Sequence, residues 1–387
     1  MIPLRYNVRN LLVRKVSTGM TVFGIALVVT ILDAVLALAS GLESTLASAA
    51  SPRNVIVMRR GATSAEASAL LPETVAKVKA AAGVELGEGG VPVATEAFVT
   101  SVLVPVAGGK GERLVMARGV DARAALVHES VRYETGGPPR ANGGIAIGCK
   151  AADELGGARI GSTLPFGRRD WVVVGIFSAG GSALESEVWT DLRDLMTDMK
   201  RDPVSILTFR ASEPARVEAI ARAVNDDPSL SVKALTETAY YAEQGRTGAE
   251  TYRSGMIVAA LMAIGAVFAG MNTMYTAVAG RVREIATLRA LGFSRRAVLA
   301  SFVAESLAIG AAGGLLGAAF TVFLFVFVWR SMTLLGGGLR QVVVTFQPTA
   351  PVLAAGVLFA MAIGALGGYL PARSAARLEV VHALRRT

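Results

Sequence analysis

Residues able to do chemistry are few in this chain of 387 residues, which has one cysteine, Cys149, and two histidines, His128 and His382. A metal site built from Cys and His ligands is therefore not available, and no disulfide can form within the chain. The sequence also lacks a G-x-x-x-x-G-K-[ST] phosphate loop, since "AGGKGERL" has neither that spacing nor a hydroxyl residue after its lysine. We expect no catalytic residue, no metal site and no cofactor bound by this chain.

Two carboxylates stand inside long apolar segments. Asp33 lies well inside the first segment, where a charged side chain costs about 2.5 to 3.5 kcal/mol on insertion scales. It either makes a polar contact at a subunit interface or serves as a conformational latch, or it lies near the outer interface and reaches water; the sequence leaves these open. Glu305 lies near the start of the third segment, where its depth favours an interfacial position.

The third candidate is a charged stretch between two apolar segments, residues 282–296, "VREIATLRALGFSRR". Ile285, Leu288 and Leu291 recur every third residue in a run of good helix formers, which predicts a short helix with a narrow apolar stripe. The alternative is a solvated basic loop that only fixes the topology.

The end of this short helix also has sequence signals. Gly292 suits the left-handed residue that ends a helix, and Ser294 suits the N-cap of the next one. Phe293 and Val298 are spaced as a hydrophobic staple across that cap. The stretch therefore predicts a helix, a sharp stop and a restart.

Four apolar segments must position these residues: 18–41, 255–280, 302–329 and 349–370. The chain is 52% hydrophobic and only 18% charged, with a mean hydropathy of +0.50. A helix needs about 20 residues to cross a hydrocarbon core of about 30 Å, and all four segments are long enough. The length of the first segment disfavours a cleaved signal peptide.

Charge placement orients the predicted spans. Residues 1–18, 281–296 and 371–387 together carry 13 basic and 2 acidic residues, whereas residues 43–254 carry 24 basic and 26 acidic ones. By the positive-inside rule, both termini and the 281–296 loop face the cytoplasm. Because the basic residues cluster at membrane edges, the pI near 10.0 does not indicate nucleic-acid binding.

The segment between the first and second spans is long enough for a core of its own. "RNVIVMRR" and "WVVVGIFSA" are typical of strands, whereas "PETVAKVKAAAG" and "PARVEAIARAVNDDP" are typical of amphipathic helices. Glycine-rich breaks separate them. This pattern predicts an α+β domain, with a division into two lobes left open and the strand order undetermined.

The expected fold class is a membrane protein with four transmembrane helices, one followed by three, and a large extracytoplasmic α+β domain between the first and second. The predicted boundaries are a cytoplasmic amphipathic helix 1–17, spans 18–41, 255–280, 302–329 and 349–370, the inserted domain 42–254, a cytoplasmic helix and loop 281–301, an outer loop 330–348 and a cytoplasmic tail 371–387.

Glycines recur at four-residue spacing in the last two spans, as Gly310, Gly313, Gly314, Gly317, Gly364 and Gly368. Such faces let helix backbones approach closely, so these residues are predicted to pack helices together. Whether the partner helix belongs to this chain or to a second copy is open.

The stretch "GRVREIATLRALGFSRRAVLASFVAESLAIGAAGGLLG" closely resembles the signature of FtsX-like permeases, a family that includes the macrolide exporter and the lipoprotein-releasing transporter. The matching positions are Arg283, Glu284, Leu288 to Gly292, Ser294, Glu305 and Gly310 to Gly317. The ending "PARSAARLEVVHALR" resembles the family's last motif, with Val381 where proline is more usual. "NVRNLLVRK" is similar to its N-terminal amphipathic helix, and "VMARGVD" and "WVVVGIFSAGGSALESEVW" to its periplasmic domain.

The resemblance implies a bacterial inner-membrane protein in which two permease chains pair and each offers its short cytoplasmic helix to an ABC ATPase subunit. The implied contacts are Arg283, Glu284, Ile285, Leu288, Arg289, Leu291, Gly292, Phe293 and Ser294. ATP and Mg²⁺ would be held by that separate ATPase, and its motion would reach the outer domain through the spans. A periplasmic adaptor protein and membrane lipid are the other implied partners.

The hypothesis is a permease that exports or extracts an amphiphilic substrate, such as a drug, peptide, lipid or lipoprotein. The alternative is an FtsX-like signalling subunit that transports nothing and activates a cell-wall hydrolase. A secondary transporter is a third interpretation, which would need no ATPase partner.

Overall fold

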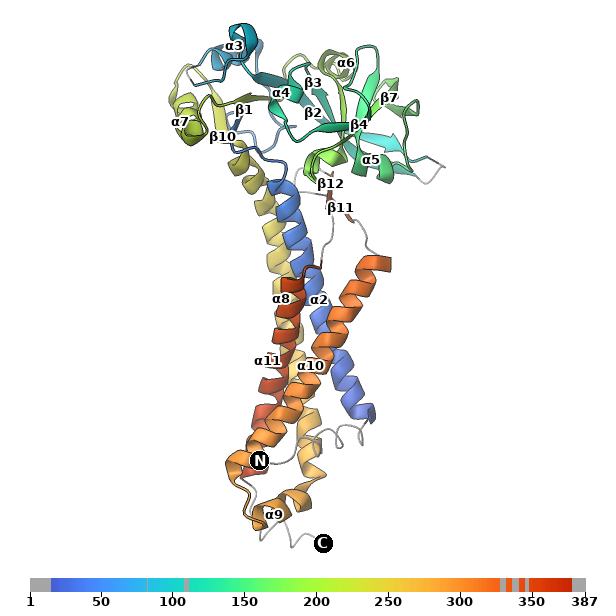
Figure 1. The fold of residues 1–387 in the computed structure, drawn as a ribbon, viewed down its shortest axis with the longest axis vertical. Helices are drawn as coiled ribbons and strands as arrows, with labels where there is room; N and C mark the ends of the chain where they lie inside the picture. Colours follow the sequence, from blue (N-terminus) through green and yellow to red (C-terminus); the bar gives the residue numbers. More distant parts are fainter. Residues whose placement is uncertain are drawn as a thin grey trace. The chain divides into compact units, whose positions relative to one another are not determined.

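The computed structural model describes residues 15–81, 83–107, 111–327, 332–335, 341–344 and 348–377 (Figure 1). These residues form two compact units. We call the first the helical unit, from the ranges 1–40, 250–330 and 346–387, and the second the inserted domain, from 41–249 and 331–345. Most of the predicted N-terminal helix 1–17, of the loop 330–348 and of the tail 371–387 lies outside the described residues.

The long helices are α2 (Lys15–Ala47), α8 (Glu237–Ala279), α10 (Arg295–Phe327) and α11 (Ala350–Ala376), and the short α9 (Val282–Ala290) follows α8. Within the described residues, four helical stretches are long and apolar enough to cross a membrane: Val16–Ala47, Arg253–Ala279, Arg295–Phe327 and Ala350–Ala376. The expected arrangement of one span, an inserted domain and three further spans is confirmed (Figure 1).

Glycines set the close packing of the helical unit. A methyl group at Gly313 would come within 2.8 Å of Ile25 on α2, and one at Gly317 within 2.7 Å of the Ala26 carbonyl oxygen. The other four predicted packing glycines, Gly310, Gly314, Gly364 and Gly368, lie between α10 and α11 in equally close approach. All six therefore face helices of this same chain, which the sequence could not decide.

The inserted domain is built on one ten-stranded sheet with the strand order β10-β1-β9-β2-β3-β8-β5-β7-β4, and β6 pairs with β7. The strands are β1 (Asn54–Arg59), β2 (Ala94–Pro105), β3 (Glu112–Val120), β4 (Arg132–Gly136), β5 (Gly144–Gly148), β6 (Thr163–Phe166), β7 (Arg169–Ser178), β8 (Glu187–Asp191), β9 (Ile206–Arg210) and β10 (Val232–Thr236). The pairs β3 with β8 and β5 with β7 are parallel, and the other pairs are antiparallel.

Short helices cover this sheet: α3 (Pro72–Lys79), α4 (Ala124–Val127), α5 (Cys149–Glu154), α6 (Leu192–Asp198) and α7 (Val217–Asp226), with 3₁₀ turns η1 (Glu88–Gly90), η2 (Ala183–Ser186) and η3 (Pro214–Arg216). The α+β expectation is confirmed. Residues 54–59 and 169–178 form strands, and 72–79 and 217–226 form helices, as the sequence patterns indicated.

Two hydrophobic cores share the sheet. One gathers Val55, Phe209 and Val232 from β1, β9 and β10 with Val75 and Ile220 from α3 and α7. The other gathers β2, β3, β5, β7 and β8 with α5 and α6, and its largest side chain is Trp171, which is fully buried. The two lobes suggested by the sequence are therefore two cores on one continuous sheet.

A hairpin between the third and fourth spans was not expected. β11 (Met332–Leu335) and β12 (Gln341–Val344) pair antiparallel and belong to the inserted domain, although they follow α10 in the chain. The run from 330 to 348 had been predicted only as a loop.

Candidate functional site

The stop after α9 is built by the backbone. Gly292 has φ +90°, its N–H donates to the Arg289 carbonyl at 3.2 Å, and the Phe293 N–H donates to the Leu288 carbonyl at 3.1 Å. These two bonds form a Schellman motif, which satisfies carbonyls at the helix end. The predicted short helix with a glycine stop is confirmed, and only glycine takes this left-handed conformation without strain.

The restart is equally local. α10 begins at Arg295, and the Ser294 hydroxyl oxygen accepts from the Ala297 N–H at 3.2 Å. This is the N-cap bond predicted for Ser294. Val298, one turn later, is buried in the core of the helical unit. The direction of α9 relative to α10 is thus set by Gly292, Phe293 and Ser294.

The apolar stripe of α9 divides between the inside and the outside of the protein. Ile285 is 2% exposed and packs in the core with Met274 and Phe302, whereas Leu291 is 72% exposed and Leu288 is half-buried. Ile285 therefore anchors α9 to its own chain and is not available to a partner in this structure. Of the remaining predicted contacts, Arg283, Glu284 and Ser294 are exposed and Arg289 and Phe293 half-buried.

A buried ion pair at the base of α9 was not predicted. The Arg281 guanidinium donates to both carboxylate oxygens of Glu305 on α10, at 2.9 and 3.2 Å, and the two side chains are only 8% and 4% exposed. Two charge-assisted bonds in parallel hold a fixed geometry. Glu305 is therefore buried and neutralised by Arg281 inside the helical unit, whereas its interfacial depth stays a prediction.

We predict that Glu305→Gln lowers the unfolding free energy of the full chain in detergent by about 3 to 5 kcal/mol, because it leaves Arg281 buried without a counter-charge. Removing both charges, with Arg281→Met and Glu305→Leu together, should recover most of that loss. Arg296→Gln, at an exposed position of the same helix, serves as the control. Thermal unfolding measures all three, and a loss in Glu305→Gln no larger than in the control would contradict this role of the pair.

Asp33 lies within the helix bundle. Its side chain is fully buried, neither carboxylate oxygen has a hydrogen-bond partner among the described residues, and it packs against Gly356 on α11. The interpretation in which Asp33 reaches water near the outer interface is therefore wrong. Gly356 has no side chain, and this is what gives the carboxylate room.

We predict that Gly356→Ala destabilises the helical unit by about 1 to 3 kcal/mol, because the added methyl would overlap the Asp33 carboxylate. Asp33→Ala should rescue this loss in the double variant, which a thermal-unfolding cycle of the full chain in detergent can show. Gly265→Ala is the matched control, since a methyl there meets no atom within 4 Å. Equal effects at the two glycines would contradict the contact.

Models of known protein families match both units of the chain. A model of the MacB-like periplasmic core domain matches residues 18–227, and a model of the FtsX-like permease C-terminal region matches residues 256–380. The chain belongs to the FtsX-like permeases with a MacB-like periplasmic core domain. The first model alone covers more than half of the chain and includes most of α2 and the inserted domain up to α7.

Individual permease relatives match over shorter stretches. The ABC transporter permease YvrN of Bacillus subtilis is 32% identical over 120 residues, which are 30% of this chain and 26% of YvrN. A macrolide export ATP-binding/permease protein MacB of Rhodopirellula baltica is 32% identical over 141 residues, 34% of this chain and 19% of that protein. The match therefore spans about a quarter or less of the length of these relatives.

Two solved structures of related permease domains are similar at low identity. The extracellular domain of the ABC-type transporter YknZ from Gram-positive bacteria gives a TM-score of 0.36 at 16% identity, covering 47% of this chain and 99% of that one. The periplasmic region of MacB from Actinobacillus actinomycetemcomitans gives 0.38 at 10% identity, covering 48% and 90%.

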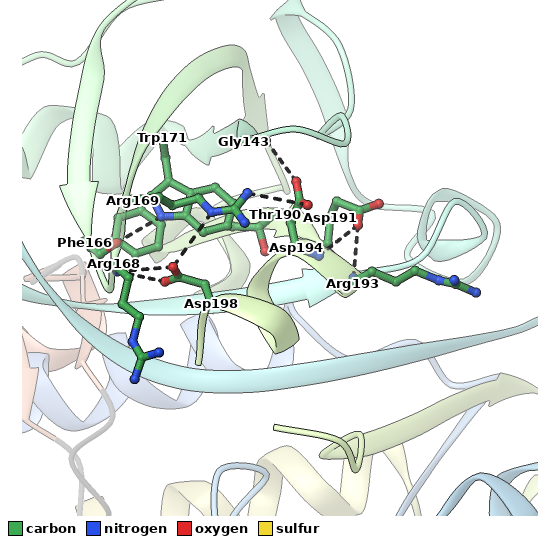
Figure 2. Close-up of polar contacts among 10 residues, drawn as sticks. All are labelled: Gly143, Phe166, Arg168, Arg169, Trp171, Thr190, Asp191, Arg193, Asp194 and Asp198. Carbon is green, nitrogen blue, oxygen red and sulfur yellow. Dashed lines mark hydrogen bonds and ion pairs between the residues drawn. The ribbon is translucent and has the colours of Figure 1, made fainter. Parts of the chain in front are cut away.

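Within the MacB-like domain, a cluster of polar side chains ties the β6–β7 turn to α6 (Figure 2). Asp198 accepts from the Arg168 N–H at 3.1 and 3.2 Å, and Arg169 lies 3.5 Å from Asp194 and 5.1 Å from the centre of the Trp171 ring. Asp191 caps α6 through two backbone N–H groups. Because both α6 carboxylates already have partners, this cluster stabilises the fold of the MacB-like domain.

Metal ligands do not gather in the parts of the permease that the structure describes. Among those residues there is no group of three or more His, Cys, Asp or Glu side chains placed to hold a metal ion.

Proposed function

We propose that this permease is the membrane subunit of an ABC transporter that exports or extracts an amphiphilic substrate. A separate cytoplasmic ATPase would hold ATP and Mg²⁺, and its motion would pass through α9 and the spans to the inserted domain. The family membership supports this proposal, and the geometry of α9 carries it. The class of substrate, a drug, peptide, lipid or lipoprotein, follows from the family alone.

α9 has the features that a docking element needs. Leu291 is exposed at the end of the helix, with Arg283 and Glu284 exposed along it. A large apolar side chain framed by charges suits a groove on a protein partner, the apolar group contributing burial and the charges fixing the register. We assign Leu288 and Leu291 to the docking contact and Ile285 to the anchor inside the permease.

The attachment of α9 is stiff enough to transmit a displacement. The Schellman motif and the Ser294 cap fix its end, and the Arg281–Glu305 pair with Ile285 fixes its start. A flexible loop would absorb a push as local motion, whereas a helix fixed at both ends passes it to α10. The proposed mechanotransmission is supported by these contacts at the two ends of α9.

The proposed setting is the bacterial inner membrane, with both termini and α9 in the cytoplasm and the inserted domain in the periplasm. The three basic strips support this orientation. A second permease copy, membrane lipid and a periplasmic adaptor protein complete the proposed assembly.

We predict that Leu291→Asp lowers the number of substrate molecules moved per ATP hydrolysed by at least about tenfold in the reconstituted complex, because a carboxylate at the docking contact loses water without gaining a partner. The permease should still insert and unfold at the wild-type temperature, since Leu291 is outside the core. Ala290→Asp adds the same charge at an exposed position of α9 that lies about 100° around the helix from Leu291 and farther from Leu288, and it should have a smaller effect. Unaltered coupling in Leu291→Asp would contradict the docking role.

The same reconstitution separates transport from signalling. A complex that hydrolyses ATP and moves no amphiphile, yet stimulates a cell-wall hydrolase, would overturn the transport proposal and leave the docking role of α9 intact.

We predict that Cys149 reacts with a membrane-impermeant maleimide in intact cells with a permeable outer envelope. Burial, with Glu185 and Glu134 adding to it, raises the pKa of the thiol to about 11, so labelling should be slow and should speed up about tenfold per pH unit between pH 7 and 9. Ser294→Cys in a Cys149→Ser background is the matched cytoplasmic position and should react only after lysis. The reverse pattern, with both thiols reactive once the protein is denatured, would contradict the orientation.

A further inference from the structure

A polar cleft in the inserted domain has no role in the proposed transmission. It lies where the end of α2, the start of β1 and the start of α8 come together, and its polar lining includes Ser48, Ser51, Asn54, His128, Glu129 and Glu237. Ala49, Ala50 and Val127 form an apolar part of the wall. Its volume of about 200 Å³ is more than ten times what one water molecule needs.

Hydrogen bonds hold two side chains of this cleft in place, and each side chain keeps one oxygen without a hydrogen-bond partner. Glu237 Oε2 accepts from the Ser51 N–H at 2.9 Å and from Asn54 Nδ2 at 3.0 Å, and Asn54 Nδ2 also donates to the Val127 carbonyl at 3.0 Å. Both hydrogens of that amide group are therefore used, which fixes the orientation of the Asn54 side chain. Its Oδ1 and the Glu237 Oε1 have no hydrogen-bond partner among the described residues.

These two oxygens belong to almost completely buried residues. Asn54 and Glu237 are each 1% exposed. A buried acceptor without a partner is costly, and more so when it is charged, so two of them on side chains that are hydrogen-bonded to each other indicate that a donor belongs beside them.

The nearby cations are committed elsewhere. Arg118 donates to both oxygens of Glu187, at 2.6 and 2.7 Å, and Arg210 lies 2.7 Å from Glu129. His128 is neutral at physiological pH, because burial, with Arg118 adding to it, lowers its pKa to about 4. The cleft therefore offers acceptors and a carboxylate that the neighbouring basic groups do not neutralise by contact.

We propose that this cleft binds a small organic amine in its protonated form, with the ammonium group donating to Glu237 Oε1 and Asn54 Oδ1 and the carbon chain lying against Ala49, Ala50 and Val127. An ammonium group brings three N–H donors and a positive charge, which match the two acceptors and the carboxylate. A metal ion fits less well, since the described residues place no group of three acidic, His or Cys ligands together.

The position of the cleft gives such a ligand a mechanical consequence. Glu237 is the first residue of α8, Asn54 is the first residue of β1, and Ser48 follows the end of α2. An amine bound here would hold the starts of α8 and β1 together, next to the end of α2. The binding site is independent of the proposed ATPase contact at α9.

The test uses n-butylammonium chloride as the probe and the full chain in detergent, with isothermal titration calorimetry. We expect saturable binding, weakened at least about tenfold by Glu237→Gln, which keeps the shape of the side chain and removes its charge. Burial raises the pKa of Glu237 to about 7, against the opposing Ser51 amide, so binding near pH 7 should release protons and weaken about tenfold per unit below pH 7.

Two further variants and two further probes test the same contacts. Glu243→Gln, at an exposed glutamate on α8 that pairs with Lys233, should bind the probe like the wild type. Ala50→Leu fills the cleft from its wall and should abolish binding even if Glu237→Gln fails to fold. Neutral n-butanol and tetramethylammonium, which lacks N–H donors, should not bind.

The proposal is overturned if n-butylammonium shows no saturable binding up to about 100 mM to the folded chain. It is overturned equally if n-butanol or tetramethylammonium binds as well as the amine, or if calcium chloride binds at the Glu237 position and the amine does not.

Discussion

The buried pair between Arg281 and Glu305 is the contact on which the arrangement of α9 and α10 depends. It joins Arg281, the residue before α9, to Glu305 on α10, and so ties together the two helices on either side of the stop at Gly292. Removing two charges from water is costly unless each finds the other in good geometry, so the pair is either complete or strongly destabilising.

The fold and the local form of α9 could be predicted because their causes are local. Runs of about 20 apolar residues have few alternatives to a membrane span. Gly292 and Ser294 act through bonds to residues within five positions, so the stop and the restart are written in the same short stretch. The same applies to strands such as β7, in which buried Trp171, Val173 and Phe177 alternate with more exposed residues.

The parts that could not be predicted depend on contacts between distant positions. Nothing near Asp33 in the sequence marks Gly356 as its neighbour, and the apolar stripe of α9 does not reveal that Ile285 faces inward while Leu291 faces outward. The pairing of β11 with β12 could not be predicted for another reason. The two strands are short, and the strong hydropathy signal of the spans on either side masks their pattern. The orphaned oxygens of Asn54 and Glu237 likewise appear only once β1 and α8 are brought together.

On α10 four glycines are buried and several large apolar residues are exposed, which is the reverse of the usual arrangement in a water-soluble protein. Gly310, Gly313, Gly314 and Gly317 are buried, whereas Leu315, Phe323 and Phe327 are 63%, 49% and 73% exposed. In lipid, moving a large apolar group outward loses nothing, because acyl chains surround it as well as a protein core would. The helices are then held together by van der Waals attraction between closely packed backbones. This attraction weakens when the backbones separate by a fraction of an ångström. Such a bundle has little tolerance for gradual sliding, and its helices would tend to shift as a block or separate altogether.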